Sequence, residues 1–577
     1  MFTLSEPTWP RCGRADLVTG LGDCGGIHVP GHTACLAHLS TTERSAYLAA
    51  LNPGDNVDHR GTPFTEALIS LLLNALRDPD TEEPHFGTAN FSRARFADEA
   101  DFGEARFAGA AWFVGAQFSD EANFGAARFS REAMFGNAEF SQGGWFHFAE
   151  FSDEANFHGA RFSDHASFHR AQFADRAEFA TAVFLDEADF GEARFTAAPE
   201  LGPLVCADAV DLSGALFETP VSIQIAAPSL VCERTRWEAT ATLRLRYSVV
   251  DLSHAVLSTP MAITAHPTPF TYGRTSLAEE PLAGQWSGVV MHSVQGVDAA
   301  HLVLTDTDLS FCLFSGAFHL DQLRLEGRCA FAATPTGLHL RHGVWPYRWT
   351  RRRALAEEHH WRAQTAGQPA PPPGHSSRRL WHTGRHHPTV ELTPDPEDVA
   401  VIYRQLRKAF EDGKNEPGAA DFYYGEMEMR RHDRSSTPPG ERGLLWCYWL
   451  LSGYGLRASR AVAWLLAAMA ATVLLVMGLG LPDSAPRQTA TGAVPAGGGR
   501  VTLTLDKPDP RLTLPVGERF TTERFDKAFQ VVLNSVVFRS SGQDLTTWGT
   551  YTEMICRFTE PALLALAVLA MRNRIKR

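Results

Sequence analysis

Lysine is scarce in this sequence: only five occur among 577 residues, all beyond residue 400, against 48 arginines. The formal net charge is −13, so the chain lacks the basic excess of a general nucleic-acid-binding protein, and no nucleic-acid partner is expected. The nine cysteines are scattered and odd in number, which argues against a disulfide framework and favours a reducing compartment. No basic segment followed by an apolar one opens the chain, so we expect no signal peptide.

Motifs for catalysis are also missing. We find no Gly-rich phosphate loop, no nucleophile elbow and no Cys–His pair placed for catalysis. We therefore expect no enzyme, no catalytic residue and no cofactor apart from a structural metal. Low complexity is excluded as well, because the shares of Gly and Pro in the chain are close to average. A chain of this length is expected to fold as several domains.

Phenylalanine is abundant and periodic. From Phe91 to Phe195 twenty phenylalanines follow one another at gaps that alternate between five and six residues. Alanine stands two places before nineteen of them, and Gly144 is the exception. On an α-helix these rings would split onto two faces, and on a flat strand an odd step would alternate them between faces. A chain that turns a corner in every unit can point every ring inward, with the alanine on the same face. The pattern thus predicts a β-solenoid.

These A-x-F units resemble those of pentapeptide-repeat proteins, in the eleven-residue variant with a central Phe. The resemblance implies a mainly β fold, a right-handed quadrilateral β-solenoid, and a bacterial, actinobacterial-like origin. It extends from Phe91 to Phe195 without a break. The beat returns in "VDAAHLVLTDTDLSFCLFSGAFHLDQLRL" (297–325). We interpret the stretch between as an irregular continuation of the solenoid; a small separate β domain is the alternative.

The outward positions of the regular part are acidic, with 18 Asp or Glu against 9 Arg from Phe91 to Phe195. Some pentapeptide-repeat proteins imitate the charge and shape of DNA and bind topoisomerases, so the resemblance permits that function. A solvated charged surface explains the same excess.

The N-terminal segment departs from the beat and holds four candidate metal ligands, Cys12, Cys24, Cys35 and His38. Three thiolates and one imidazole are a common structural zinc set, and Cys35 and His38 form a C-x-x-H pair. Buried free thiols beside a surface His are the alternative. Two helices follow, in "STTERSAYLAAL" and "TPFTEALISLLLNALRD", and one of them is expected to cover the open end of the solenoid.

Beyond the solenoid, Pro, His and Arg are frequent over 346–392, which predicts a disordered linker. Its arginines at 351–353 are candidates for contact with anionic lipid. A helical hairpin is predicted next. Asp395 and Pro396 suit the start of its first helix, Gly413 suits its end, and a second helix is expected around 418–432. The resemblance adds that several bacterial pentapeptide-repeat membrane proteins carry such a hairpin.

The C-terminal part predicts a pair of transmembrane helices. Residues 461–481 carry no charge and suffice to span a bilayer. A second span, 553–571, includes Glu553, Arg557 and Glu560, whose spacing lets them pair on one face. We favour a position of these three at the outer interface over one inside the bilayer. Arginines flank both spans, so both termini are expected in the cytoplasm of a two-span protein of the cell membrane.

Between the spans, "TTERFDKAFQVVLNSVVF" has helical apolar spacing. Span, short helix and span resemble the pore module of potassium-type channels in outline. The filter motif T-x-G-[YF]-G is missing, and "RSSGQDLT" stands in its place, so we favour simple packing of an interfacial helix.

The leading hypothesis is a membrane-anchored scaffold whose cytoplasmic solenoid binds an unknown protein partner. A channel- or transporter-like protein with a regulatory solenoid, and a DNA mimic, are the alternatives. Membrane lipid is a further expected partner, and oligomers could form through the membrane domain. The expected domains are 1–83 (cap), 84–195 (regular solenoid), 196–345 (irregular solenoid), 346–392 (linker), 393–434 (hairpin) and 435–577 (membrane domain).

Overall fold

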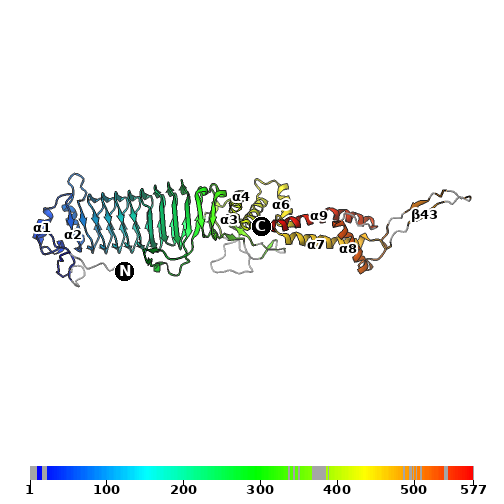
Figure 1. The fold of residues 1–577 in the computed structure, drawn as a ribbon, viewed down its shortest axis with the longest axis horizontal. Coiled ribbons are helices and arrows are strands. Elements are labelled where there is room, and N and C mark those ends of the chain that lie inside the picture. The colour runs from blue at the N-terminus through cyan, green and yellow to red at the C-terminus, as the bar shows by residue number, and fades with distance from the viewer. Residues whose placement is uncertain are drawn as a thin grey trace. The chain divides into compact units, whose positions relative to one another are not determined.

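The chain folds into two compact units, Met1–Phe422 and Tyr423–Arg577 (Figure 1). A computed structural model describes residues 9–15, 23–334, 338–341, 345–348, 351–366, 385–387, 389–484, 488–492, 497, 500–501, 503–506, 510–537 and 544–575.

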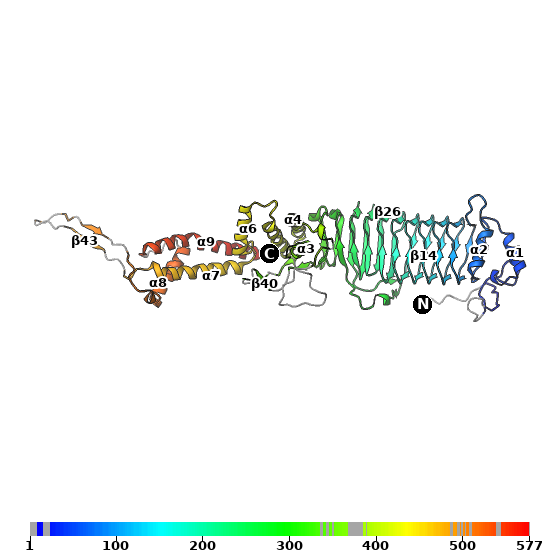
Figure 2. The same ribbon diagram turned by 180° about the vertical axis from the view of Figure 1, so that it is seen from behind.

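The first unit is a β-solenoid, as the Phe beat predicts. Short strands stack in parallel along four sides, seen from behind in Figure 2. Side 1 consists of β1 (Val57–Asp58), β4 (Ala89–Asn90), β8 (Ala111–Trp112), β12 (Ala133–Met134), β16 (Ala155–Asn156) and β20 (Ala177–Glu178). Side 2 begins with β2 (Pro63–Phe64), β5 (Arg95–Phe96), β9 (Gln117–Phe118), β13 (Glu139–Phe140), β17 (Arg161–Phe162) and β21 (Val183–Phe184). Side 3 begins with β6 (Ala100–Asp101), β10 (Ala122–Asn123), β14 (Gly144–Trp145), β18 (Ala166–Ser167) and β22 (Ala188–Asp189). Side 4 begins with β3 (His85–Phe86), β7 (Arg106–Phe107), β11 (Arg128–Phe129), β15 (Glu150–Phe151), β19 (Gln172–Phe173) and β23 (Arg194–Phe195).

Every second unit of the beat bends at a tight turn directly after its Phe. The amide of Ala94 donates to the carbonyl of Phe91, and Arg93 between them has a left-handed φ of 58°. The same conformation recurs at the equivalent positions of later units, as at Glu104 and Asn137. A left-handed third residue is the mark of a type II turn, and it reverses the chain enough to keep the next ring inside. Every Phe of the beat is at most 1% exposed.

The solenoid then changes from four sides to three. Side 1 ends at β20, and side 2 continues as long strands that span two former sides. These are β24 (Glu200–Cys206), β27 (Val221–Ala226), β30 (Ala241–Arg246) and β33 (Met261–Ala265), followed by β37 (Leu302–Thr305) and β38 (Arg324–Glu326). Side 3 continues as β25 (Ala209–Asp211), β28 (Ser229–Val231), β31 (Val249–Asp251) and β36 (Val290–Ser293), and side 4 as β26 (Leu216–Phe217), β29 (Arg236–Trp237) and β32 (Val256–Leu257). The parallel ladder of side 2 continues through β38, so residues 196–326 continue the solenoid, with one insertion between β33 and β36.

The N-terminal end of the solenoid is closed by helices. A short 3₁₀ helix, η1 (Leu36–His38), precedes α1 (Thr41–Ala49), which Ser40 and Glu43 cap reciprocally. The apolar helix α2 (Glu66–Ala75) stands between β2 and β3, where the first coil would otherwise place a side-3 strand. It contacts β6, the first strand of that side. The solenoid therefore starts at Val57, inside the segment that we assigned to the cap.

An insertion interrupts the three-sided part. The hairpin of β34 (Thr271–Tyr272) and β35 (Thr275–Ser276) and the turn η2 (Glu280–Leu282) lie between β33 and β36. Tyr272 reaches back to side 1 and donates its hydroxyl to Glu178 at 3.2 Å. Two further 3₁₀ turns, η3 (Ala299–His301) and η4 (Leu320–Gln322), lie among the last coils.

The C-terminal end of the solenoid is followed by helices of the same unit, in part where a disordered linker was predicted. The helix α3 (Ala356–Ala366) is buried over half its length, so that prediction is wrong for these residues. Two strand pairs precede it in the chain, β39 (Ala332–Ala333) with β42 (Arg353–Ala354), and β40 (Leu338–Arg341) with β41 (Trp345–Arg348). Residues 367–384 of the expected linker lie outside the described residues.

The predicted helical hairpin is present. After the turn η5 (Val390–Leu392), α4 (Pro396–Asp412) has Asp395 as its N-cap and Gly413 as its C-cap, and α5 (Glu416–His432) follows. The apolar faces meet at Phe410 and Phe422, whose ring centroids are 4.8 Å apart.

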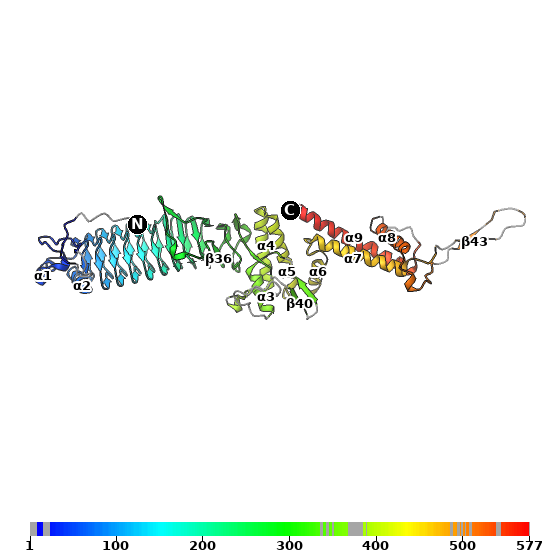
Figure 3. The same cartoon turned by 90° about the horizontal axis from the view of Figure 1, so that it is seen from below.

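The second unit contains two long apolar helices that run side by side (Figures 1 and 3). These are α7 (Ala458–Leu475), extended by the π-helical turn η6 (Val476–Gly480), and α9 (Thr547–Ile575). The unit also includes α6 (Pro439–Ser452), the pair β43 (Thr489–Thr491) and β44 (Thr504–Asp506), the turn η7 (Val516–Glu518) and α8 (Thr522–Val537).

The helix α8 packs against η6 through one apolar face, with Val531 and Val532 buried beside Val476. Phe525 and Phe529, which share the predicted apolar stripe, are half-exposed. Most of "RSSGQDLT", the stretch in the position of a channel filter, lies outside the described residues.

Candidate metal centre and interaction surface

A short antiparallel hairpin brings the first two candidate ligands together. Residues 11–15 pair with residues 23–27, and the amide of Cys12 donates to the carbonyl of Gly26 at 2.8 Å. The sequence spacing of Cys12 and Cys24 is wide for a metal knuckle, but the hairpin brings their side chains close together from its two paired strands. The amide of Gly26 lies 3.4 Å from the Cys24 sulfur. A side chain at Gly26 would collide with Cys35, since its Cβ would lie 2.7 Å from that Cβ.

The other two ligands lie at the two ends of one turn. Cys35 is the N-cap residue of η1 and His38 is its last residue, so the C-x-x-H spacing puts both side chains on one face. His38 Nε2 lies 2.9 Å from the carbonyl of Ala15. A carbonyl can only accept a hydrogen bond, so Nε2 carries the proton and Nδ1 presents its lone pair to the cysteines.

The four ligand atoms form a compact set, all within 4.8 Å of one another. Cys24 Sγ lies 3.7 Å from Cys35 Sγ, and His38 Nδ1 lies 3.5 Å from Cys12 Sγ and 3.3 Å from Cys35 Sγ. A tetrahedral ion with bonds of about 2.3 Å to sulfur and 2.0 Å to nitrogen separates such ligands by roughly 3.5–3.8 Å. The group could therefore hold a metal ion.

The pKa values of two of the thiols are shifted in opposite directions. A hydrogen bond from the Cys35 thiol lowers the pKa of Cys24 to about 6, and the same pairing raises the pKa of Cys35. The pairing thus favours ionisation of one of the two sulfurs, and a thiolate is the form that binds metal. All three cysteines are free and buried. His28 and His32, which lie nearby in sequence, are not in the set: His28 bonds to the carbonyl of Arg11, and His32 faces Glu43.

The corner between sides 2 and 3 carries a row of carboxylates along the regular solenoid. This carboxylate ridge consists of Asp98, Glu99, Asp120, Glu121, Asp164, Asp186 and Glu187. Its side chains are exposed or half-buried, and no Lys or Arg stands in the corner turns of the ridge. Burial and the neighbouring carboxylates, Asp101 and Glu121 among them, raise the pKa of Glu99. The ridge is therefore a surface of concentrated negative charge.

Side 4 has balanced positive and negative charges instead. Arginines stand on four of its strands, each beside a glutamate: Arg106 pairs with Glu83, Arg128 with Glu83 and Glu150, Arg194 with Glu218, and Arg236 with Glu238. Exposed pairs of this kind contribute little to stability. They neutralise this side, so the solenoid surface is polarised around its axis.

Comparison with protein families agrees with this architecture. The family of pentapeptide repeats, in nine copies, matches residues 102–150. The coils over these residues are built of pentapeptide repeats. The resemblance stated from the A-x-F units is confirmed, whereas a bacterial origin remains an expectation. No curated protein and no solved structure matched the chain.

The interior of the pentapeptide-repeat solenoid is solid. Phe102, Phe124 and Phe146 stack with ring centroids 5.0 Å apart and planes within 3° of parallel. Such ladders fill the regular coils, so ligands and partners can reach only the outer surface of this part.

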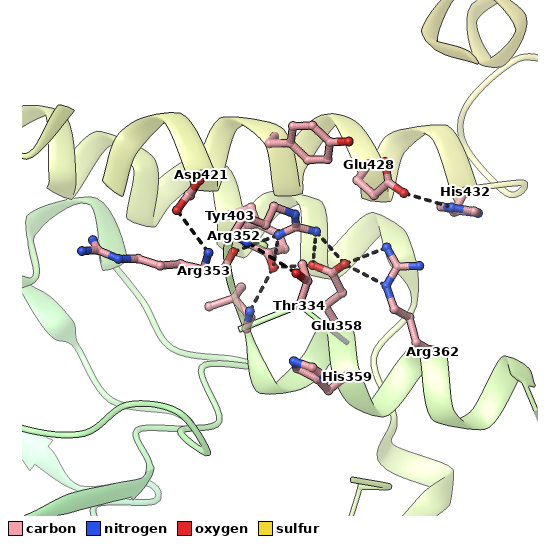
Figure 4. Close-up of polar contacts among 12 residues, drawn as sticks. Thr334, Arg352, Arg353, Glu358, His359, Arg362, Tyr403, Asp421, Glu428 and His432 are labelled. Carbon is pink, nitrogen blue, oxygen red and sulfur yellow. Dashed lines mark hydrogen bonds and ion pairs between the residues drawn. The ribbon is translucent and has the colours of Figure 1, made fainter. Parts of the chain in front are cut away.

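One polar cluster was not anticipated from the sequence (Figure 4). The Glu358 carboxylate accepts two hydrogen bonds from Arg352 at 2.6 Å, one from Arg362 at 2.8 Å and one from Tyr403 at 2.5 Å. Burial opposes ionisation, yet the two guanidinium charges lower the pKa of Glu358 to about 2. Arg352 is 3% exposed, so it is not available for the lipid contact suggested for the arginines at 351–353. The cluster could not be predicted from the spacing of Arg352, Glu358 and Arg362, because Tyr403, which completes it, comes from α4, far along the chain.

Proposed function

We propose that this protein is a membrane-anchored scaffold whose pentapeptide-repeat solenoid binds a protein partner. The observation that carries the proposal is the exposure of large apolar side chains on α7 and α9. Leu466 is 60% exposed, Ile555 64% and Phe558 81%. Both helices are long and apolar enough to cross a bilayer. Buried core helices of soluble proteins cover such side chains, so a lipid environment is the simplest explanation.

The proposed topology has two spans with both ends in the cytoplasm. Arg457 and Arg460 precede α7 or lie in its first turn, and Arg572 lies near the end of α9. Positive residues favour the cytoplasmic side. The segment with β43 and β44 then lies outside, and the solenoid lies in the cytoplasm.

Topology can be tested by cysteine labelling in sealed vesicles. The exposed Cys447 in α6 should react with a membrane-impermeant maleimide only from the cytoplasmic side. A cysteine introduced as Thr504→Cys, in a Cys447→Ser background, should react only from the opposite side. Labelling of both positions from one side would contradict the two-span arrangement, and extraction of the chain by alkaline carbonate would contradict the anchor itself.

The scaffold role is supported by the closed interior and the polarised surface of the solenoid. A photoreactive side chain at Glu121, on the carboxylate ridge, should crosslink to a discrete partner in native membranes. One at Arg128, on side 4, serves as the control for random collision. Absence of a discrete adduct from positions on all sides of the solenoid would contradict the scaffold.

We further propose that Cys12, Cys24, Cys35 and His38 bind one structural Zn²⁺. Four protein ligands leave no open position for catalysis, and tetrahedral S₃N sets are typical of structural zinc. The purified chain should contain about one equivalent of zinc by elemental analysis. Cys24→Ser should lose it, whereas Cys447→Ser should retain it. Equal zinc content in the two variants would contradict the site.

A further inference from the structure

A small cavity lies beside α3 at the C-terminal end of the solenoid unit. Its volume is about 330 Å³, near the lower end of the range for ligand pockets. The walls are mostly apolar, with the rings of Phe311 and Phe331 and the methyl group of Ala356. The polar groups among its lining residues are those of Ser310, His359, His360 and Arg385. Among the described residues, no carboxylate lines it.

Arg385 provides a positive charge without a counter-ion in the described part of the chain. Its guanidinium carbon lies 4.1 Å from the centroid of the Phe311 ring. A guanidinium over an aromatic ring is attracted to the face of the ring, and its N–H groups remain hydrogen-bond donors. Those donors match the two oxygens of a carboxylate. The cavity thus has an exposed cationic side chain beside an aromatic ring.

His360 provides a second polar group. Its side chain is buried, with the residue only 7% exposed, and its Nδ1 has no hydrogen-bond partner among the described residues. A buried polar atom without a partner is costly. His360 lines the cavity, so its ring lies beside a ligand bound there. His359 is differently placed, because its Nε2 already lies 2.7 Å from the carbonyl of Ala333.

The surroundings of His360 are electropositive. Burial, followed by the nearby His387, His359, His386 and Arg385, lowers the pKa of His360 to about 4. The ring of His387 stands perpendicular to that of His360 at 5.3 Å. The imidazole is therefore neutral at physiological pH and can offer a neutral hydrogen bond beside the charge of Arg385.

We propose that this cavity binds a small organic anion with a carboxylate on an apolar, planar body. The carboxylate would pair with the edge of Arg385 and bond to His360, and the apolar body would lie against Phe331 and Ala356. A small inorganic anion would leave the apolar walls uncovered, and an uncharged apolar molecule would leave Arg385 without a counter-ion. This site is independent of the membrane anchor and of the scaffold role.

The test uses the full chain in lipid nanodiscs and titration calorimetry, with empty nanodiscs as the blank. The probes are 3-phenylpropionate, its uncharged amide 3-phenylpropanamide, and acetate. We expect 3-phenylpropionate to bind with one site per chain, and the amide and acetate to bind at least tenfold more weakly. Equal affinity for the acid and the amide, or no heat from 3-phenylpropionate up to millimolar concentration, would overturn the proposal.

Variants then locate the site. Arg385→Gln should weaken binding of 3-phenylpropionate about tenfold or more, and His360→Phe, which keeps a ring, should weaken it severalfold. Ala332→Leu should block the cavity. Arg351→Gln removes an exposed arginine outside the lining and should bind like the parent chain. A thermal melt of each variant checks folding. Unchanged binding by folded Arg385→Gln or by Ala332→Leu would also overturn the assignment.

Discussion

At the scale of single residues, the solenoid depends on identical contacts that recur from coil to coil. Each buried ring lies between the rings of the previous and the next coil, and alanine leaves room beside them. Gly144 marks how little space remains: a Cβ there would lie 3.0 Å from the ring of Phe162. A contact at this distance requires a neighbour to shift by a few tenths of an ångström, so even alanine would be tight at residue 144.

Loss of one core ring should therefore be costly. Phe124→Ala removes a side chain with no exposure that stacks on two neighbours, and we expect it to destabilise the solenoid by about 3–5 kcal/mol. Phe148→Ala is the matched control, because Phe148 is half-exposed and lies outside the ladders; its effect should stay within about 0.5 kcal/mol. Urea titration followed by far-UV circular dichroism compares the two. Similar midpoints would show that the ladders do not stabilise the fold.

At the scale of elements, α3 joins the end of the solenoid to α4 with two neighbouring glutamates of opposite behaviour. Burial raises the pKa of Glu357 to about 7, although the amide of Phe314 donates to its carboxylate. Glu358 is ionised throughout, because Arg352 and Arg362 surround it. One glutamate thus responds to physiological pH and the other does not.

The pH dependence of stability follows from these values. The folded pKa of Glu357 lies above its ordinary value of 4.5, so its contribution is fully present below pH 4.5 and is lost as the pH rises through about 7. Raising the pH from 5 to 8 should therefore lower the thermal midpoint of the parent chain relative to that of Glu357→Gln. The parent chain should lose on the order of 2–3 kcal/mol in its free energy of unfolding over this range. A constant difference would contradict the assignment.

Glu358→Gln is the contrasting variant. It leaves two buried guanidinium groups without their carboxylate, and we expect a loss of about 3–5 kcal/mol. Because the pKa of Glu358 is about 2, that loss should be the same at pH 5 and pH 8. Thermal midpoints at both values measure it. A loss that appears only at one of the two pH values would show that the pair does not behave as described.

What could be predicted at this scale depended on local pattern. The hairpin of α4 and α5 could be predicted because Asp395, Pro396 and Gly413 mark the ends of its first helix in the sequence. The Cys and His residues at 12, 24, 35 and 38 were recognisable by type and count. The helix α3 was not, since its Arg, Glu and His residues are typical of a solvated linker and become core only through pairing with Tyr403.

At the scale of the whole molecule, the regular coils could be predicted and the change in their shape could not. The Phe beat ends at Phe195. Beyond it Val221 pairs with Ala241, whereas Ala111 pairs with Ala133 in the regular part, so each later coil uses a shorter stretch of chain. Long strands with Val, Ile and Leu replace two short ones. Their apolar alternation indicates strand but not which side of a coil it builds, because pairing with the strand of the next coil decides that.

Coil length should govern which deletions are tolerated. In the regular part Ala111 pairs with Ala133 and Ala133 with Ala155, so residues 133–154 make up one complete coil. Deleting 133–154 removes that coil and returns every following strand to its own side, so we expect cooperative unfolding and protease resistance to persist. Deleting only 133–137 shifts every following strand by one side. Trypsin digestion should fragment that variant, and equal resistance of both would contradict the coil register.

The position of α2 in the first coil has a consequence for biosynthesis. Since α2 precedes the regular coils in the chain, the helix that covers the N-terminal end of the solenoid leaves the ribosome before those coils. Each later coil can then pair with the folded coil before it as soon as its own short stretch has emerged, because it needs no contact with a distant part of the chain. At each stage of synthesis in this order the solenoid has one incomplete end, and the next stretch of nascent chain pairs with it.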